Sequence, residues 1–144
     1  MYLTYEEYIN YGGSLDEAAF TDLEYEARVY VDWYTFRRLH APDTEISEEV
    51  KECMYHIMKL LQNKMDALNV PIDESGNGGV YGAGIASQSN DGVSISYNVL
   101  SAKELIDASK NEIDSMINRY LQGMRNSLGH RLLFRGIYPG EEVY

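Results

Sequence analysis

The sequence has little cysteine and no long apolar run. Cys53 is the only cysteine among 144 residues, which excludes an internal disulfide and any zinc site built from several cysteines. No apolar stretch approaches the roughly 20 residues that span a bilayer, so no membrane partner is expected. The first residues carry acids and lack the basic and apolar regions of a signal peptide. We therefore expect a cytoplasmic protein, and the length suits one domain.

The chain is also poor in cations. Twelve Lys and Arg residues stand against twenty-three Asp and Glu residues, a formal net charge of −11. Cations that neutralise phosphates drive nonspecific binding to nucleic acid, so tight binding of DNA or RNA is not expected. Residues 1–50 hold twelve acids and three arginines, whereas residues 119–135 hold four arginines and no acid. This asymmetry fits two solvated faces, and it also fits the two complementary surfaces of a head-to-tail ring.

Patterns that carry catalysis or bind metals are missing. The three histidines, His40, His56 and His130, are scattered and form no His-Glu-x-x-His pair. The glycine-rich residues 76–84 match neither the dinucleotide-binding nor the P-loop pattern, and no serine lies in a Gly-x-Ser-x-Gly elbow. Paired acids such as those at 141–142 fit a solvated tail. We predict that the chain is not an enzyme and has no cofactor, no metal ligand and no catalytic residue.

Apolar periodicity predicts about four helices. Residues 4–7 have the capping-box pattern Thr-x-x-Glu, so a short helix is expected from Thr4 to about Tyr11. Asp16 is the expected N-cap of a second helix that ends near Arg38. Its buried stripe recurs every three or four residues and comprises Ala19, Phe20, Leu23, Ala27, Tyr30, Val31 and Tyr34.

Two longer helices are expected further along the chain. Ser47 is a good cap for a third helix that continues until residues 70–71. Its stripe is Val50, Met54, Ile57, Leu61, Met65 and Leu68. Residues 101–104 form a second capping box and begin a fourth helix, which Gly123 or Gly129 ends. Its apolar face is Leu105, Ile106, Ile113, Met116, Ile117, Tyr120, Leu121 and Met124.

The segment between these two helices has the composition of turns and strands. Residues 73–92 are rich in glycine, serine and asparagine, which is typical of a loop or an exposed hairpin. Val93, Ile95 and Tyr97 alternate with polar residues and predict a strand, whose partner begins at about Ile85. The predicted fold is mainly α: a small bundle of about four helices with an inserted β-hairpin at about residues 80–99.

Residues 130–144 form an apolar tail. Gly129, Gly136 and Pro139 prevent the tail from extending the last helix, so residues 1–129 are expected to form the helical domain and the tail to be extended. Apolar side chains are costly to leave in water, so we expect the tail to dock on another chain; the alternative is that it folds back over its own bundle. The expected anchors are Leu132, Leu133, Phe134, Arg135, Ile137 and Tyr138.

Tyrosine is in excess, with thirteen residues beside three phenylalanines and one tryptophan. A tyrosine ring buries area while its hydroxyl keeps a hydrogen bond at a wet rim, so this residue type suits protein contacts. Ordinary core use accounts for part of the excess. We expect tyrosines outside the helical stripes, such as Tyr2, Tyr8 and Tyr25, to lie at contact surfaces.

Four stretches, in this order, resemble the head-tail adaptor (connector) family of long-tailed bacteriophages and prophages. They are residues 2–8, residues 34–39, residues 86–97, and residues 120–121 followed by 132–137. Their order and spacing carry the resemblance, and together they span most of the chain. The resemblance implies a structural protein that forms a dodecameric ring beneath the portal and joins the capsid to stopper or tail components.

The same resemblance implies partners and a location. Double-stranded DNA would pass through the ring without specific binding, because an acidic lumen repels phosphates. The chain would reside in the host cytoplasm during assembly and then in the neck of the virion, with its tail on the portal. Contacts between subunits would join the acidic N-terminal helices to Arg119, Arg125 or Arg131 of a neighbour. A small acidic module that binds or regulates a partner is the alternative function, and a hydrolase is a third.

Overall fold

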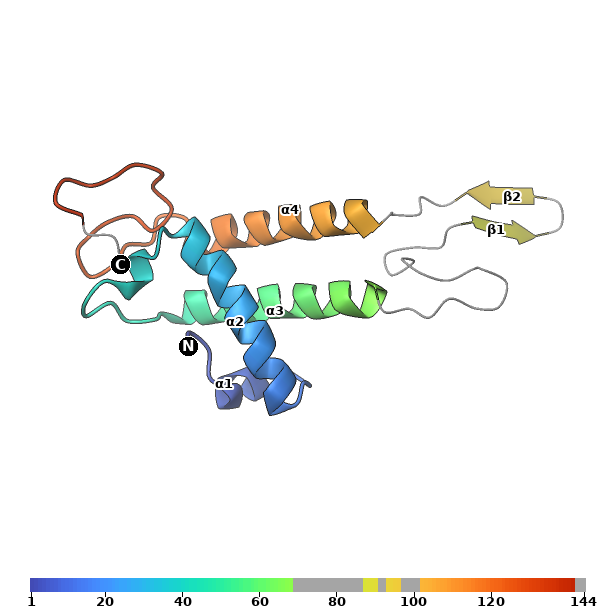
Figure 1. The fold of residues 1–144 in the computed structure, drawn as a ribbon, viewed down its shortest axis with the longest axis horizontal. Helices are drawn as coiled ribbons and strands as arrows, with labels where there is room; N and C mark the ends of the chain where they lie inside the picture. The colour runs from blue at the N-terminus through green and yellow to red at the C-terminus, as the bar shows by residue number, and fades with distance from the viewer. Residues whose placement is uncertain (69–86, 91–92, 97–101, 142–144) are drawn as a thin grey trace. The chain divides into compact units, whose positions relative to one another are not determined.

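The computed structural model describes residues 1–68, 87–90, 93–96 and 102–141, and it is mainly helical (Figure 1). Its elements are α1 (Tyr5–Asn10), α2 (Glu17–Tyr34), the 3-10 helix η1 (Arg38–His40), α3 (Glu48–Leu68), β1 (Ser87–Asn90), β2 (Val93–Ser96) and α4 (Ala102–Leu121). The prediction of a mainly α chain with about four helices is confirmed for the described residues.

The chain divides into two compact units. The first consists of Met1–Lys59 with Ile113–Tyr144, and the second of Leu60–Glu112. Helices α3 and α4 each contribute residues to both units.

The side chains just before α1 and α2 explain where these helices begin. The hydroxyl of Thr4 accepts a hydrogen bond from the Glu7 N–H at 3.3 Å, and the Glu7 carboxylate accepts one from the Thr4 N–H at 2.9 Å. The Asp16 carboxylate accepts the Ala19 N–H at 2.8 Å. The predicted capping box and the predicted N-cap are both confirmed.

The core of the first unit is built from the predicted stripes. Its fully buried apolar side chains from helices are Phe20, Ala27 and Val31 from α2, Val50, Cys53, Met54, Ile57 and Met58 from α3, and Ile113, Ile117 and Leu121 from α4. Tyr8 joins this core, because its ring centroid lies 5.1 Å from that of Phe20 and 5.9 Å from that of Tyr55. The prediction that Tyr2 and Tyr8 lie at contact surfaces is wrong, since both are buried in their own subunit.

The predicted stripes are wrong for Met65 of α3 and Ile106 of α4, each of which is 46% exposed. A step of four residues turns an α-helix about 40° beyond a full turn, so a stripe extended by further steps of four leaves the buried face. In α3 the side chains of the predicted stripe are buried as far as Leu61, and Met65 lies one such step beyond it.

Strands β1 and β2 pair antiparallel between α3 and α4 in the sequence. Ser87 lies opposite Ser96, and Asn90 opposite Val93. Ile95 also lies on β2, whereas Ile85, Tyr97 and the predicted turn residues 91–92 lie outside the described residues. The inserted hairpin at about residues 80–99 therefore stays a prediction as a whole, as do the third helix's end at 70–71 and the cap at Ser101.

Leu61 tests the helical core, because it is fully buried on α3. Replacing Leu61 with Ala should lower the free energy of unfolding by about 2–5 kcal/mol, since it removes buried methyl groups and leaves a cavity. Met65→Ala, one turn further along the same helix, should cost less than about 1 kcal/mol. Denaturant titration followed by circular dichroism measures both values. A wild-type midpoint for Leu61→Ala would show that this residue does not support the core.

Candidate functional site

The end of α2 leads into a strained stretch of backbone. The Thr35 N–H and hydroxyl both donate to the Val31 carbonyl and close the helix. Phe36 and Arg37 then take φ angles of 52° and 58°. Two consecutive left-handed residues that are not glycine cost about 1 kcal/mol or more each, so tertiary contacts must hold them. This turn ends α2 before the predicted end near Arg38 and leaves Arg38 buried.

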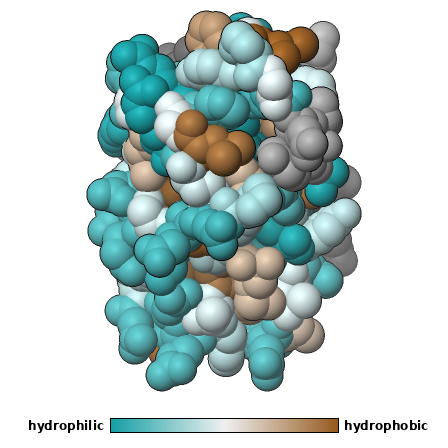
Figure 2. All heavy atoms as spheres, turned by 90° about the vertical axis from the view of Figure 1, so that its left-hand side faces the viewer, coloured by the Kyte–Doolittle hydropathy of each residue, from teal (hydrophilic) through white to brown (hydrophobic). Residues whose placement is uncertain are grey.

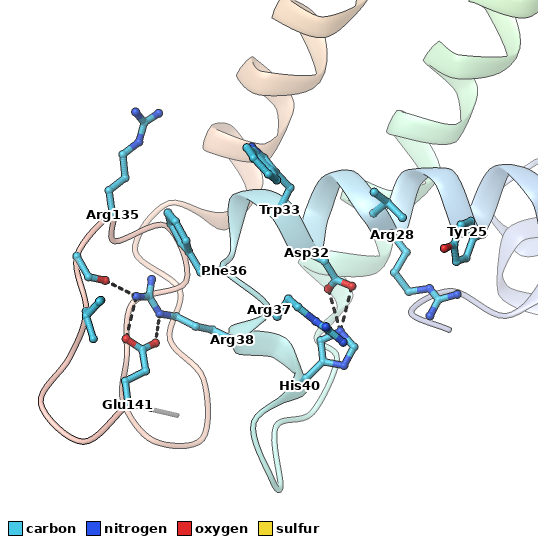
Figure 3. A pocket seen from close by; sticks show the side chains of 13 residues that line it. Tyr25, Arg28, Asp32, Trp33, Phe36, Arg37, Arg38, His40, Arg135 and Glu141 are labelled. Atoms are coloured by element: carbon cyan, nitrogen blue, oxygen red, sulfur yellow. Dashed lines mark hydrogen bonds and ion pairs between the residues drawn. The ribbon is translucent and has the colours of Figure 1, made fainter. Parts of the chain in front are cut away.

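The Arg38 guanidinium binds the C-terminal tail (Figure 3). Its Nε and Nη2 donate to the two carboxylate oxygens of Glu141 at 2.5 Å and 3.1 Å. Its Nη1 and Nη2 also donate to the backbone carbonyls of Arg131, Leu132, Phe134 and Gly136. Arginine offers five donors in one plane, so a single side chain can satisfy carbonyls along a folded loop and a carboxylate.

Residues 131–141, here called the tail loop, are also held by Tyr138. Its ring stacks on His130, with centroids 4.2 Å apart and planes within 4°. Its hydroxyl accepts the Arg131 N–H at 3.0 Å, and its own N–H donates to Glu141 at 2.9 Å. The Arg38 Cζ lies 5.2 Å from the centre of the same ring, within the range of a cation–π contact. The loop is therefore closed by side chains from both of its ends.

The tail folds back over its own subunit, which corrects the prediction of an extended tail. Leu132 is 0% exposed, and its N–H donates to the Met124 carbonyl at 2.9 Å. Glu141 pairs with Arg38 and is not a solvated tail acid. The physical reason is that the buried Arg38 supplies donors that the tail carbonyls would otherwise have to find in water. Of the two alternatives for the tail, folding back over its own bundle is the one that residues 130–141 adopt.

The other predicted tail anchors differ in their exposure. Leu133 and Tyr138 are half-buried, and Phe134 and Arg135 are exposed. Ile137 is 86% exposed. Leu132 alone of the six is buried in its own subunit, so it does not serve as an anchor for another chain in this conformation.

A groove of about 820 Å³ lies between α2 and the tail loop (Figure 3). One wall is a second apolar stripe of α2 that recurs every four residues and comprises Tyr25, Val29 and Trp33, and Phe36 from the turn after the helix extends it. Ile137 contributes from the tail. Trp33 is 77% exposed, which is unusual for so large an apolar side chain. Exposed apolar side chains gathered in one groove indicate a contact with another molecule.

The groove carries a surplus of positive charge. Its cations are Arg28, Arg37, Arg38 and Arg135, and its acids are Asp32 and Glu141. Both acids already have partners. Asp32 accepts hydrogen bonds from the Tyr2 hydroxyl and from His40 Nε2, the latter at 3.0 Å, and Glu141 is bound by Arg38. Arg37 and Arg135 are exposed and make no ion pair with the described residues.

The N-terminal segment is tied to α2 beside this groove. The Tyr2 N–H donates to the buried Glu24 carboxylate at 2.8 Å, and the Arg28 Nε lies 3.4 Å from the other oxygen of that carboxylate. Burial, reinforced by the hydrogen bond to Asp32, raises the pKa of the Tyr2 hydroxyl. Tyr2 therefore stays protonated at neutral pH, and its network with Asp32 and His40 has a structural role.

The arginines predicted to contact neighbouring subunits lie elsewhere in the first unit. Arg119 is exposed on α4. Arg125 Nη1 donates to the Gly129 carbonyl at 2.6 Å, and the backbones of Arg125 and Arg131 form an antiparallel bridge. These two residues stabilise the turn that leads into the tail.

Figure 2 views the tail end and shows brown apolar patches on a mostly hydrophilic face.

Sequence reasoning missed the groove and the role of Arg38. The groove had a signal, because Tyr25, Val29 and Trp33 follow helical spacing on a face of α2 other than the predicted stripe. No sequence signal pointed to Arg38, because nothing near it in the sequence distinguishes a buried arginine from the exposed Arg37.

Comparison with family models, curated proteins and solved structures gives no match. Across residues 1–68, 87–90, 93–96 and 102–141, no three His, Cys, Asp or Glu side chains gather as metal ligands. No helix in the same part of the chain has both the length and the apolar character needed to cross a membrane.

Arg38→Met tests the tail anchor. The substitution should lower the free energy of unfolding by about 3–5 kcal/mol, because it leaves Glu141 and several carbonyls without their buried partner. Arg37→Met is the matched control and should cost less than about 1 kcal/mol, since Arg37 is exposed. Thermal or denaturant unfolding measures both. Equal losses in the two variants would contradict the assigned role of Arg38.

The Arg38–Glu141 pair also predicts a pH dependence. Arg38 lowers the pKa of the Glu141 carboxyl from 4.5 to about 2. A carboxyl with a lowered folded-state pKa stabilises the fold above its unfolded pKa, and this contribution is lost as the pH falls toward the folded value. Glu141→Gln should therefore be less stable than wild type at neutral pH, and the difference should shrink between about pH 4.5 and pH 2.

Thermal unfolding across this pH range provides the measurement. Glu45→Gln is the control, because Glu45 is exposed and makes no ion pair within the described part of the chain. A stability difference between Glu141→Gln and wild type that stays constant down to pH 2 would rule out this linkage.

Proposed function

We propose that this chain is a structural head-tail adaptor of a long-tailed bacteriophage or prophage. In this function it forms a dodecameric ring beneath the portal, joins the DNA-filled capsid to the stopper or tail, and lines the channel through which the DNA leaves. The resemblance of four sequence stretches suggests the function. The groove between α2 and the tail is the structural observation that carries it.

The groove supports an assembly function because it exposes large apolar side chains that a second chain would cover. Trp33 and Ile137, both of which line it, are 77% and 86% exposed. Burying apolar surface stabilises an assembly by about 25 cal/mol per Å², so such side chains gain most when a second chain covers them. A ring of identical subunits covers this surface in every copy.

Charge supports the passage of DNA. A net charge of −11 repels phosphates over most of the surface, which lets a duplex slide through a ring without sticking. Strands β1 and β2 fit the same proposal, because they lie between α3 and α4 in the sequence, where the family that the chain resembles carries a hairpin.

The portal contact is assigned to the folded-back tail loop. Arg135 and Ile137 line the groove and Leu132 is buried, which leaves Leu133 and Phe134 as the apolar side chains for this contact. Because Arg38 holds the loop in one shape, they can bind a partner without a large loss of conformational entropy. Tyr138 closes the loop and supports them from within.

A small acidic module that binds a single partner is the second candidate, because the same groove suits it. Sedimentation separates the two functions. An adaptor forms a large ring alone or on its portal, whereas a binding module stays monomeric or dimeric.

Phe134→Ala tests the portal contact. The full chain should co-sediment with rings of the portal protein of the same phage or prophage, and the substitution should weaken this binding about tenfold, or about 1.4 kcal/mol, because it removes an exposed aromatic anchor. Leu128→Ala is the control, since Leu128 is equally apolar and exposed but lies outside both the tail loop and the groove. A wild-type chain that fails to bind the portal would refute the adaptor function. Unchanged binding by Phe134→Ala would remove Phe134 from the contact.

A further inference from the structure

We propose that the groove between α2 and the tail loop receives the acidic N-terminal region of a second copy of this chain. The inference rests on the proposed ring and identifies the surface through which its subunits meet. It differs from the sequence prediction, which assigned this contact to Arg119, Arg125 and Arg131.

The chemistry of the groove defines what can fill it. The apolar stripe of α2 and Ile137 require apolar side chains from the occupant. Arg37 and Arg135 require carboxylates, because the groove acids Asp32 and Glu141 are already bound within the subunit. The occupant is therefore an apolar surface flanked by free acids.

The N-terminal region of the chain has this character. Residues 1–27 contain seven acids and no lysine, arginine or histidine. Three of these acids are engaged within the subunit, since Glu7 pairs with Lys51, Glu24 pairs with Arg28 and Asp16 caps α2. The exposed acids without such a partner are Glu6, Glu17 and Asp22. Ile9, on α1, adds an exposed apolar side chain to the same region.

The two surfaces lie at opposite ends of α2. Helix α1 packs beside its beginning, whereas the groove follows its second half and the tail (Figure 1). Glu17 begins α2 and Arg37 lies just beyond its end, and an 18-residue helix is about 27 Å long, so Glu17 cannot reach Arg37 of its own groove. A groove facing a groove would bring arginines together, and two acidic ends would repel each other. Head-to-tail contact is therefore the arrangement that the charges favour, and such a contact closes into a ring when its rotation permits.

A charge exchange in the full-length chain tests the proposal. The groove variant is Arg37→Glu with Arg135→Glu, and the acidic-end variant is Glu17→Lys with Asp22→Lys. Each variant alone sets like charges against each other and should weaken self-association about tenfold or more. An equimolar mixture should restore association, because each altered groove then meets an altered acidic end and each native groove a native one. Sedimentation velocity at low ionic strength measures all four samples, wild type included.

A third variant, Lys59→Glu with Arg119→Glu, is the matched control. It changes the net charge by the same amount as the groove variant, but at two exposed cations outside the groove, and it should associate like wild type. Circular dichroism establishes that each variant is folded.

The outcomes separate this inference from the proposed function. Wild-type association by the groove variant, or a mixture that fails to restore association, overturns the inference even if the chain still forms a ring on the portal. A wild-type chain that stays monomeric both alone and on the portal overturns it as well. Restored association together with a failure to bind the portal would support the contact between copies and refute the adaptor function.

Discussion

The buried guanidinium of Arg38 is the interaction on which the rest of the site depends. A buried charge costs several kcal/mol unless it is paired and hydrogen-bonded, and Arg38 meets both requirements with Glu141 and four tail carbonyls. These contacts also compensate for the strain of Phe36 and Arg37, whose left-handed backbone places Arg38 inside. Arg38 thus links the sharp end of α2 to the folded-back tail.

The groove depends on Arg38, because Arg38 holds one of its two walls in place. One wall is α2, whose inner face is held by core residues such as Val31 and whose outer face carries Trp33. The other wall is the tail loop, which exists because Arg38 and Glu141 hold it. The groove is thus completed by one ion pair beside a helix that the core has already fixed. Loss of the pair would remove a wall of the groove while leaving the helical core intact.

Sequence patterns within one helical turn predicted the helices well. They failed where residues far apart in the sequence determine the structure. The starts of α1 and α2 were predictable because Thr4 and Asp16 satisfy N–H groups only three residues away. The stripes of α2, α3 and α4 were predictable wherever an apolar face meets the core. The tail was not predictable, because its apolar sequence suits a second chain and its own bundle equally well. Tyr2 and Tyr8 were misjudged for the same reason, since composition does not tell a core tyrosine from one at an interface.

The sequence by itself determined the mainly helical content, the starts of α1 and α2, the absence of an internal disulfide and the separation of acidic and basic regions, because each depends on residue type or on neighbours within one helical turn. Only the tertiary structure decided the path of the tail and the place of the groove. Arg38 and Glu141 are 103 residues apart, and the carbonyls that Arg38 binds are 93 to 98 residues away. Packing between segments so far apart chooses which of several similar arginines is buried, and no local pattern records that choice.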